Sequence, residues 1–195
     1  MNMNASLPFQ GPPGIELRHD FKPGDLGTIV HLHGTIYARE YGFDETFEAY
    51  VAGPLAEFAR IRAHRDRIWL AEREGRIVGC IAIVGASQNE AQLRWFLVDP
   101  SARGQGLGRQ LLQEAVEFSK SQDYRSVFLW TVSTLTAAAR LYQSFGFRKV
   151  EEKPCRQWGV NVVEERYVLN LKNEDTGSAC RPSVPYTASS HEGRV

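Results

Sequence analysis

The stretch L-R-W-F-L-V-D-P-S-A-R-G-Q-G-L-G-R-Q-L-L, Leu93 to Leu112, decides the fold expected of this chain. Leu93 to Val98 is apolar and aromatic apart from Arg94, which predicts a β-strand. Asp99-Pro100 ends that strand, because proline has no N–H to donate to a β-ladder. The apolar residues that follow recur at helical spacing, so a glycine-rich turn is expected to lead from the strand into an amphipathic helix.

The glycine-rich turn predicts a phosphate site. Gly104, Gly106 and Gly108 let an anion approach the backbone, and the free N–H groups of a helix that starts at Gly104 favour negative charge. Arg103 and Arg109 add guanidinium donors. The spacing fits neither a Walker loop nor the Gly-x-Gly-x-x-Gly dinucleotide fingerprint. An ordinary strand-to-helix turn is the alternative interpretation.

Composition narrows the possible classes of protein. The chain has 195 residues, which favours a single domain, and its 23 basic and 23 acidic residues argue against a nucleic-acid or anionic-membrane partner. Cys80, Cys155 and Cys180 lie far apart without a C-x-x-C pair, so no metal site is expected. The N-terminus does not resemble a signal peptide, and no apolar run approaches the ~20 residues that span a bilayer. We therefore expect a cytoplasmic protein.

The order of predicted elements indicates an α/β fold with a mixed sheet and about four flanking helices. We expect a flexible leader over residues 1–14, one folded domain over 15–172 and a tail without a core over 173–195. Within the domain the expected order is a strand, two helices, a hairpin, the strand and helix quoted above, a strand, a helix and two strands. The bounds expected for the strands are 15–19, 68–73, 76–84, 93–98, 126–132, 147–151 and 162–171.

Two motifs in this order resemble the GNAT (GCN5-related) N-acetyltransferases. Val98, Pro100, Arg103, Gly106 and Gly108 match the acyl-CoA signature of that family. The second motif, A-A-A-R-L-Y-Q-S-F-G-F over residues 137–147, is similar to the family pattern A-x-x-L-Y-x-x-x-G-F. The wider pattern also resembles the acetyltransferase half of bacterial proteins that fuse a MarR-type DNA-binding domain to a GNAT domain.

The resemblance implies where acetyl-CoA binds. Its diphosphate is expected on the loop made of Arg103, Gly104, Gln105, Gly106, Leu107, Gly108 and Arg109. Its pantetheine arm is expected to pair with Phe96, Leu97 and Val98, and the Val98 N–H to polarise the thioester. Many members carry an asparagine where this chain has Leu135, so nearby hydroxyls (Thr131, Ser133, Thr134 and Thr136) are expected to help instead.

Tyr142 is the predicted general acid, with core packing of its ring as the alternative. An unperturbed phenol has a pKa of ~10 and stays protonated at neutral pH, so it can supply a proton to the leaving thiolate.

The acceptor side is less constrained. Tyr37, Glu40 and Tyr41 share one helix face by their spacing, and Glu40 is the first choice to bind or deprotonate the amine. Glu90 and a water chain are rival bases, while Asp44 and Glu45 also fit a solvated helix start. Arg94 is expected to hold an acidic acceptor or to pack on the sheet, and His33 is expected in the core or at its rim.

The resemblance therefore implies an N-acetyltransferase that moves an acetyl group from acetyl-CoA to a primary amine, on a small molecule or a protein lysine, in a ternary complex. A non-catalytic acyl-CoA-binding regulatory module related to MarR-type regulators is the alternative. A homodimer is common in the family.

Overall fold

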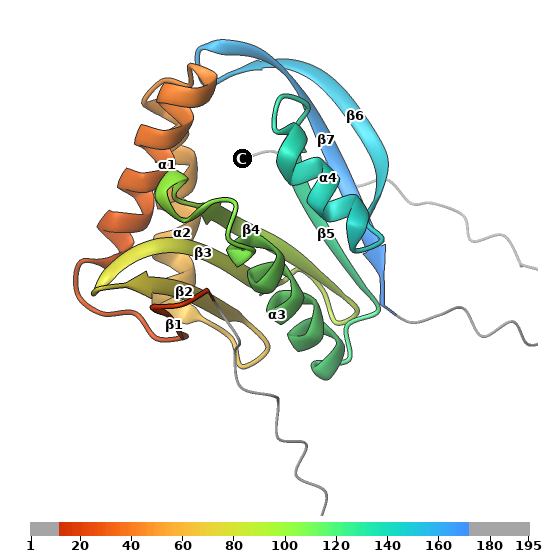
Figure 1. Cartoon of the computed structure of the whole chain (residues 1–195). Coiled ribbons are helices and arrows are strands. Elements are labelled where there is room, and N and C mark those ends of the chain that lie inside the picture. The colour runs from red at the N-terminus through yellow and green to blue at the C-terminus, as the bar shows by residue number, and fades with distance from the viewer. Residues whose placement is uncertain (1–11, 172–195) are drawn as a thin grey trace, which may run out of the picture.

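The structure, a computed structural model, describes residues 12–171, and its sheet has seven strands. The strands are β1 (Ile15–Arg18), β2 (Arg67–Arg73), β3 (Arg76–Gly85), β4 (Glu90–Val98), β5 (Ser126–Val132), β6 (Arg148–Gln157) and β7 (Val160–Asn170). The helices are α1 (Asp25–Tyr41), α2 (Thr46–Ile61), α3 (Leu107–Ser121) and α4 (Thr136–Ser144), with a short 3₁₀ helix η1 (Pro100–Ala102). The spatial order of the strands is β1-β2-β3-β4-β5-β7-β6 (Figure 1). The predicted fold class, a mixed sheet flanked by four helices, is confirmed.

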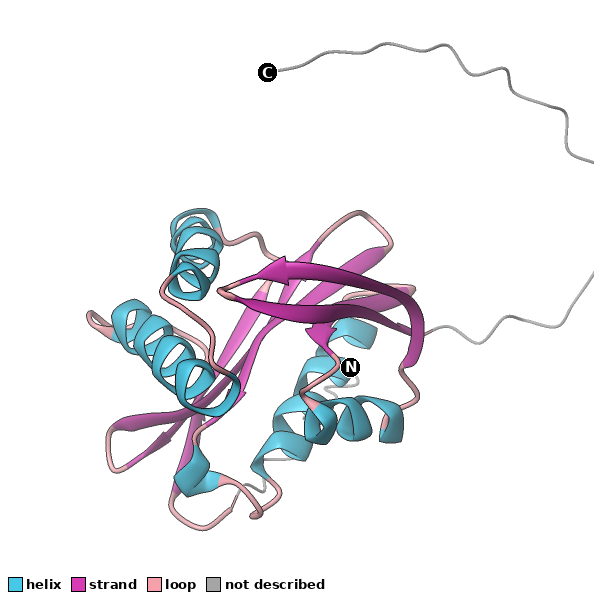
Figure 2. Ribbon diagram, turned by 90° about the horizontal axis from the view of Figure 1, so that it is seen from above, coloured by secondary structure: helices cyan, strands magenta, loops and turns pink. Residues whose placement is uncertain are grey.

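The sheet carries a core on each face, with helices on both sides (Figure 2). Helices α3 and α4 pack on one face, and α1 and α2 pack on the other. Strand β2 shows how the sequence achieves this, because successive strand residues point to opposite faces. Trp69 and Ala71 join the core under α3, whereas Ile68 and Leu70 join the core under α1 and α2.

Helix α3 begins later than the sequence predicts. The backbone at Gly104 and Gly106 is left-handed, with φ of 73° and 85°. A right-handed helix cannot include such residues, so α3 starts at Leu107 and Gly106 is its N-cap. The expectation that the helix opens at Gly104 is therefore wrong.

Strands β4 and β5 form the one parallel pair of the described sheet, and they pair only over a short stretch. Glu90–Gln92 of β4 lies beside Ser126–Phe128 of β5. Beyond this point β4 follows β3 while β5 follows β7, so the two strands spread apart (Figure 1). Their carboxyl-terminal halves, 93–98 and 129–132, therefore have no direct ladder between them.

A β-bulge near the centre of β4 changes the face of the sheet to which its side chains point. Ala82 opposes Arg94 and Cys80 opposes Leu97, so Trp95 and Phe96 share a single partner on β3. Trp95 has a positive φ of 47°, and the Cys80 thiol donates a hydrogen bond to its carbonyl oxygen at 3.0 Å. A bulge of this kind re-aims side chains. The buried residues of β4 accordingly change from the α3 face, before the bulge, to the α1–α2 face after it.

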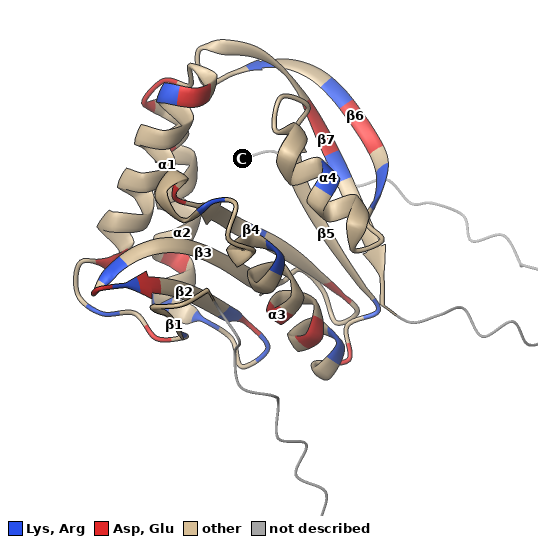
Figure 3. Ribbon diagram, in the orientation of Figure 1, with Lys and Arg blue, Asp and Glu red and all other residues tan. Residues whose placement is uncertain are grey.

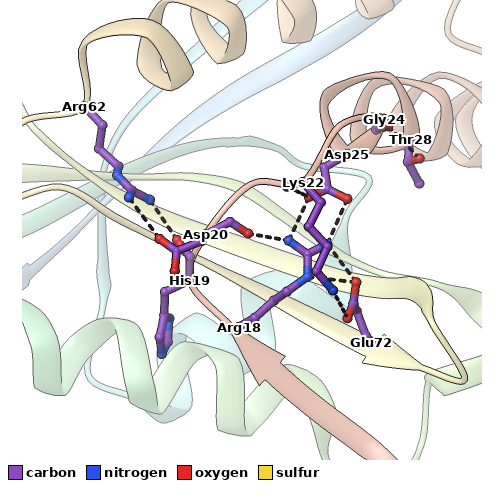
Figure 4. A network of polar contacts seen from close by, with 9 residues as sticks. All are labelled: Arg18, His19, Asp20, Lys22, Gly24, Asp25, Thr28, Arg62 and Glu72. Carbon is purple, nitrogen blue, oxygen red and sulfur yellow. Dashed lines mark hydrogen bonds and ion pairs between the residues drawn. The ribbon is translucent and has the colours of Figure 1, made fainter.

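An ion-pair network ties the start of α1 to the edge of the sheet (Figure 4). The Arg18 guanidinium donates to the Asp25 carboxylate at 2.7 and 2.8 Å and to Glu72 at 2.8 Å. Gly24 occupies the N-cap position of α1, and the Asp25 carboxylate accepts from the Lys22 N–H. Burial raises the pKa of Asp25, but these hydrogen bonds outweigh it and hold that pKa below its ordinary value.

The last hairpin is longer than the sequence predicts. Strands β6 and β7 pair from Arg148↔Val168 to Gln157↔Val160, well beyond the expected 147–151 and 162–171. The turn between them reaches the loop between α1 and α2, where the Asp44 N–H donates to the Trp158 carbonyl oxygen at 3.0 Å. The β6–β7 hairpin therefore lies along one side of the gap between β4 and β5.

No helix within residues 12–171 is long and apolar enough to cross a membrane. Residues 1–11 of the predicted leader and the whole predicted tail, 173–195, lie outside the described residues.

Candidate active site

A cavity of about 360 Å³ lies between the end of β4, the loop after it and α4. Nine of the ten residues predicted to hold the coenzyme line it, namely Phe96, Leu97, Val98, Arg103, Gly104, Gly106, Leu107, Gly108 and Arg109. Gln105 is the exception, because its side chain turns away to accept from Arg73 at 2.6 Å and to donate to the Ser101 carbonyl at 3.2 Å.

The loop between β4 and α3 is the positively charged rim of this cavity (Figure 3). Gly104 and Gly106 have no side chains that could cover the amide groups at the start of α3. A Cβ added at either glycine would meet no atom within 4 Å, so the space in front of the loop is open. Open N–H groups beside Arg103 and Arg109 suit a diphosphate.

Glu40 lies at this loop and is outside the lining of both main cavities. Its carboxylate accepts from Arg103 Nη1 at 2.9 and 3.0 Å, while Arg103 Nε donates to the Val98 carbonyl oxygen at 3.0 Å. The side chain of Arg103 thus joins α1 to the end of β4. Tyr37 and Tyr41, which were predicted to share a helix face with Glu40, do line cavities. Tyr41 lines the larger cavity, and Tyr37 lines both the larger cavity and the smaller one described next.

A second, smaller cavity of about 110 Å³ lies on the α1–α2 side of β4. Aromatic side chains from five elements and two loops line it: Tyr37, Phe43, Phe47, Tyr50, Trp95, Phe96, Trp130, Tyr142 and Trp158. Arg94 and Glu164 are the two charged side chains among its lining residues within the described chain. Their charges are opposite, so the cavity has one side chain that suits an anionic group and one that suits a cationic group.

The two cavities meet at the gap between β4 and β5. Tyr37, Phe96 and Leu135 line both of them. Leu135 stands where the family pattern has asparagine, and of the four nearby hydroxyl residues Thr131 lines the smaller cavity. Two ligands, one in each cavity, can therefore reach each other beside β4.

Tyr142 is buried against the aromatic wall, 5% exposed, with its ring 6.0 Å from that of Phe96. Burial raises its pKa far above the ordinary value for a phenol, and the neighbouring Tyr37 and Tyr167 raise it further. The pKa of Tyr37 is raised for the same principal reason, burial. Both phenols therefore carry their protons at neutral pH.

His33 also lines the smaller cavity, yet it is 3% exposed. Its Nδ1 lies 2.8 Å from the Ile29 carbonyl oxygen, so that nitrogen carries the proton. Burial lowers the pKa of His33 to about 4, which keeps the imidazole neutral at pH 7. The prediction of a core or rim position is confirmed.

The other predicted bases are not brought to the smaller cavity. Glu90 accepts from Ser126 and Arg166, each at 3.4 Å, at the place where β4 and β5 still pair. Asp44 caps the first turn of α2 through Thr46. Neither Asp44, Glu45 nor Glu90 is among the lining residues.

Sequence reasoning missed Glu164 and Trp158. Both come from the β6–β7 hairpin, far from the motifs that carry the family resemblance. Trp158 lies at a tight turn with φ of 52°, followed by Gly159 with φ of 78°. The pair Trp158-Gly159 between two strand-like runs was the available signal for a turn, but nothing local indicates where that turn docks.

No group of three or more His, Cys, Asp or Glu residues within 12–171 is arranged to hold a metal ion.

Comparisons with known proteins agree with this geometry. Residues 32–147, more than half of the chain, match the model of the Acetyltransferase (GNAT) family. An uncharacterized N-acetyltransferase of Schizosaccharomyces pombe is 31% identical over 144 residues, which are 72% of this chain and 86% of the yeast protein. The N-acetylaspartate synthetase of Xenopus tropicalis is 37% identical over 83 residues, 42% of this chain. The matched part is only 31% of that synthetase's own length.

Solved structures share the fold. The structure of YncA of Salmonella typhimurium, described as a putative acetyltransferase with its cofactor acetyl-CoA, has a TM-score of 0.66 at 19% identity. The alignment covers 86% of this chain and 99% of that one. Together with the loop and its cavity, these matches show that the chain belongs to the GNAT family and is an acyl-CoA-dependent N-acyltransferase with acetyl-CoA as its co-substrate.

Proposed function

We propose that this protein transfers an acetyl group from acetyl-CoA directly to a primary amine, with donor and acceptor bound at the same time. The observation that carries the proposal is the meeting of the two cavities beside β4. The larger one is lined by the loop suited to a diphosphate, and the smaller one is lined by aromatic side chains with Arg94 and Glu164. A shared gap favours direct attack over a relay through an acyl-enzyme. Cys80, on β3 beside the bulge of β4, is fully buried, and burial raises the pKa of its thiol to about 12.

In this proposal the amine nitrogen attacks the thioester carbonyl carbon, a C–N bond forms and the C–S bond breaks. The backbone N–H of Val98 polarises the carbonyl, as an oxyanion donor does. The position of Val98 in the lining of the coenzyme cavity, at the end of β4, supports this role.

Tyr142 then gives its proton to the departing thiolate. A phenol with a raised pKa is a weak acid in water, but the same burial also raises the basicity of a thiolate formed beside it. The Tyr142 hydroxyl and the CoA thiolate lie in the same buried environment, so their pKa values rise together and the proton can still pass from the phenol to the thiolate.

The amine must lose a proton before it attacks. Glu164 is the carboxylate that lines the smaller cavity, which we call the acceptor cavity. We propose that Glu164 binds the ammonium group there and takes its proton. Glu40, the first choice from the sequence, is held by Arg103. We therefore give Glu40 a positioning role, in which it sets Arg103 against the end of β4.

The proposal is tested by the release of CoA thiol from acetyl-CoA with a panel of amines. Turnover with any primary amine supports the enzyme. Tight binding of acetyl-CoA with no turnover on any amine supports the regulatory module instead. Glu164→Gln is expected to lower kcat/KM for the amine with KM for acetyl-CoA nearly unchanged, whereas Glu40→Gln is expected to raise KM for acetyl-CoA.

A cytoplasmic location and a homodimer remain predictions, as does kinship with the MarR fusion proteins. The size of the purified protein by light scattering tests the dimer.

A further inference from the structure

The acceptor cavity contains a positive charge that the fold does not neutralise. Arg94 is partly buried, and its one hydrogen-bond partner in the described chain is the neutral Gln92 carboxamide, at 3.2 Å. Its guanidinium also lies 5.0 Å from the Trp95 ring. Each of the ion pairs found within residues 12–171 involves other residues.

An unpaired guanidinium in this place is costly. Burial lowers the pKa of Arg94, which means that the charged form is short of water. Removing part of the hydration of a cation without supplying an anion costs free energy. Arg18, for comparison, has two carboxylate partners.

The backbone is arranged to aim this charge at the acceptor cavity. Without the bulge at Trp95, neighbouring residues of β4 would point to opposite faces of the sheet. With it, Arg94 and Trp95 both line the smaller cavity. The bulge thus places a cation and an apolar ring side by side, and an arginine fork matches a carboxylate in two parallel hydrogen bonds.

The rest of the cavity fits the remainder of such a ligand. Glu164 provides negative charge for an ammonium group. Phe47, Tyr50 and Trp158 pack against one another with ring centroids 4.9 to 6.1 Å apart, and they form an apolar wall. A volume of about 110 Å³ suits a small molecule better than a polyamine chain.

From these observations we propose that the acceptor is a small zwitterion, an amino acid with an apolar or aromatic side chain. Arg94 binds its carboxylate, Glu164 faces its amine and the aromatic wall takes its side chain. This rests on the function proposed above and names the substrate class of the same site. The product is the N-acetylamino acid. The ammonium group gives one proton to Glu164 before it attacks, and the nitrogen loses a second proton after the C–N bond forms, which restores the proton that Tyr142 gives to the CoA thiolate.

The test compares matched acceptors that differ by one carboxylate. L-Phenylalanine is set against phenethylamine, and L-leucine against 3-methylbutylamine, each with saturating acetyl-CoA. We expect kcat/KM for each amino acid to exceed that of its amine by 10-fold or more. In Arg94→Gln we expect about a 100-fold loss for the amino acids and less than a threefold change for the plain amines, with Arg94→Lys intermediate. Equal or better use of phenethylamine by the wild-type protein overturns the inference and leaves the enzyme proposal standing.

A binding measurement tests the inference without turnover. Titration calorimetry of the CoA-saturated protein with N-acetyl-L-phenylalanine and with N-acetylphenethylamine compares the two products directly. We expect the carboxylate-bearing product to bind at least 10-fold more tightly, and Arg94→Gln to abolish that difference. Equal affinities in the wild-type protein contradict the inference. Spermidine serves as the opposite chemical class, and its preferred acetylation would also overturn the proposal.

Discussion

At the scale of single residues, the hydroxyl of Tyr142 gives the most direct test of the proposed general acid. Tyr142→Phe keeps the buried ring and removes the proton donor, so we expect kcat to fall by about 100-fold or more with KM values nearly unchanged. Steady-state kinetics with both substrates measures this. Tyr167→Phe is the control, because its hydroxyl bonds Glu165 at 3.1 Å and it does not line either cavity. An unaltered kcat in Tyr142→Phe removes the acid role.

A second prediction concerns His33 and pH. Its pKa is about 4 when folded and 6.5 in its unperturbed state, so below pH 6.5 the unfolded chain binds a proton that the folded chain does not. Stability therefore falls as pH drops from 6.5 towards 4, by up to about 1.4 kcal/mol per unit. His33→Asn keeps a donor for the Ile29 carbonyl and cannot titrate, so we expect a shallower fall. Urea unfolding at a series of pH values between 6.5 and 4.5 measures it, and parallel curves for the two proteins would contradict it.

Single residues also show where sequence reasoning succeeds and where it stops. The loop after β4 was singled out by its glycine spacing and by the resemblance to the family, and Arg103, Gly106 and Gly108 do line one cavity, while its coenzyme role stays a prediction. Glu164 and Trp158 could not be predicted as site residues, because their position depends on the pairing of β6 with β7 over nine residue pairs. Glu40 was placed on the correct helix face, but its ion pair with a residue 63 positions away carries no local signal.

At the scale of elements, the network at the start of α1 is a test of how the helix is held (Figure 4). Arg18→Met leaves the Asp25 carboxylate, 7% exposed as a residue, without its main partner. We expect a loss of about 1.5–3 kcal/mol, as for hydrogen bonds to charged groups. Equilibrium urea unfolding measures it.

Arg60→Met is the matched control, because the Arg60–Glu57 pair is solvent-exposed and is expected to contribute less than about 0.5 kcal/mol. The lowered pKa values of Asp25 and Glu72 add a pH dependence. The stabilisation is present above the unfolded pKa values, 3.8 and 4.5, and is lost as the pH falls through the folded ones. Equal losses in the two variants would show that burial of the first pair adds nothing.

The elements themselves followed from hydrophobic periodicity, and strand β5 has the bounds that the sequence predicts. The bulge in β4 did not follow. Residues 93–98 are apolar apart from Arg94, so the sequence alone does not predict that Ala91, Leu93, Trp95 and Leu97 are buried on different faces. The structure instead buries them on two faces, because each face of the sheet has its own helices.

At the scale of the whole molecule, binding of the coenzyme should couple the two halves of the sheet. We expect CoA at 100 times its Kd to add about 2.7 kcal/mol, or roughly 5–10 °C in Tm. A thermal melt with and without CoA measures this. Arg109→Ala should reduce the shift, and Arg148→Ala, exposed on β6, should not. The absence of any shift in the wild-type protein would contradict the assigned coenzyme site.

The contact between Trp158 and Asp44 has a consequence for how such a protein can change. In the function proposed above, the α1–α2 loop and the last hairpin contribute to the acceptor cavity and contact each other at this point, whereas the loop after β4 lines the larger cavity. Because acceptor binding and coenzyme binding use different segments in that proposal, substitutions around residues 43–51 and 157–164 can exchange one amine for another while acetyl-CoA binding is preserved. A laboratory search for new acceptors belongs in those two segments.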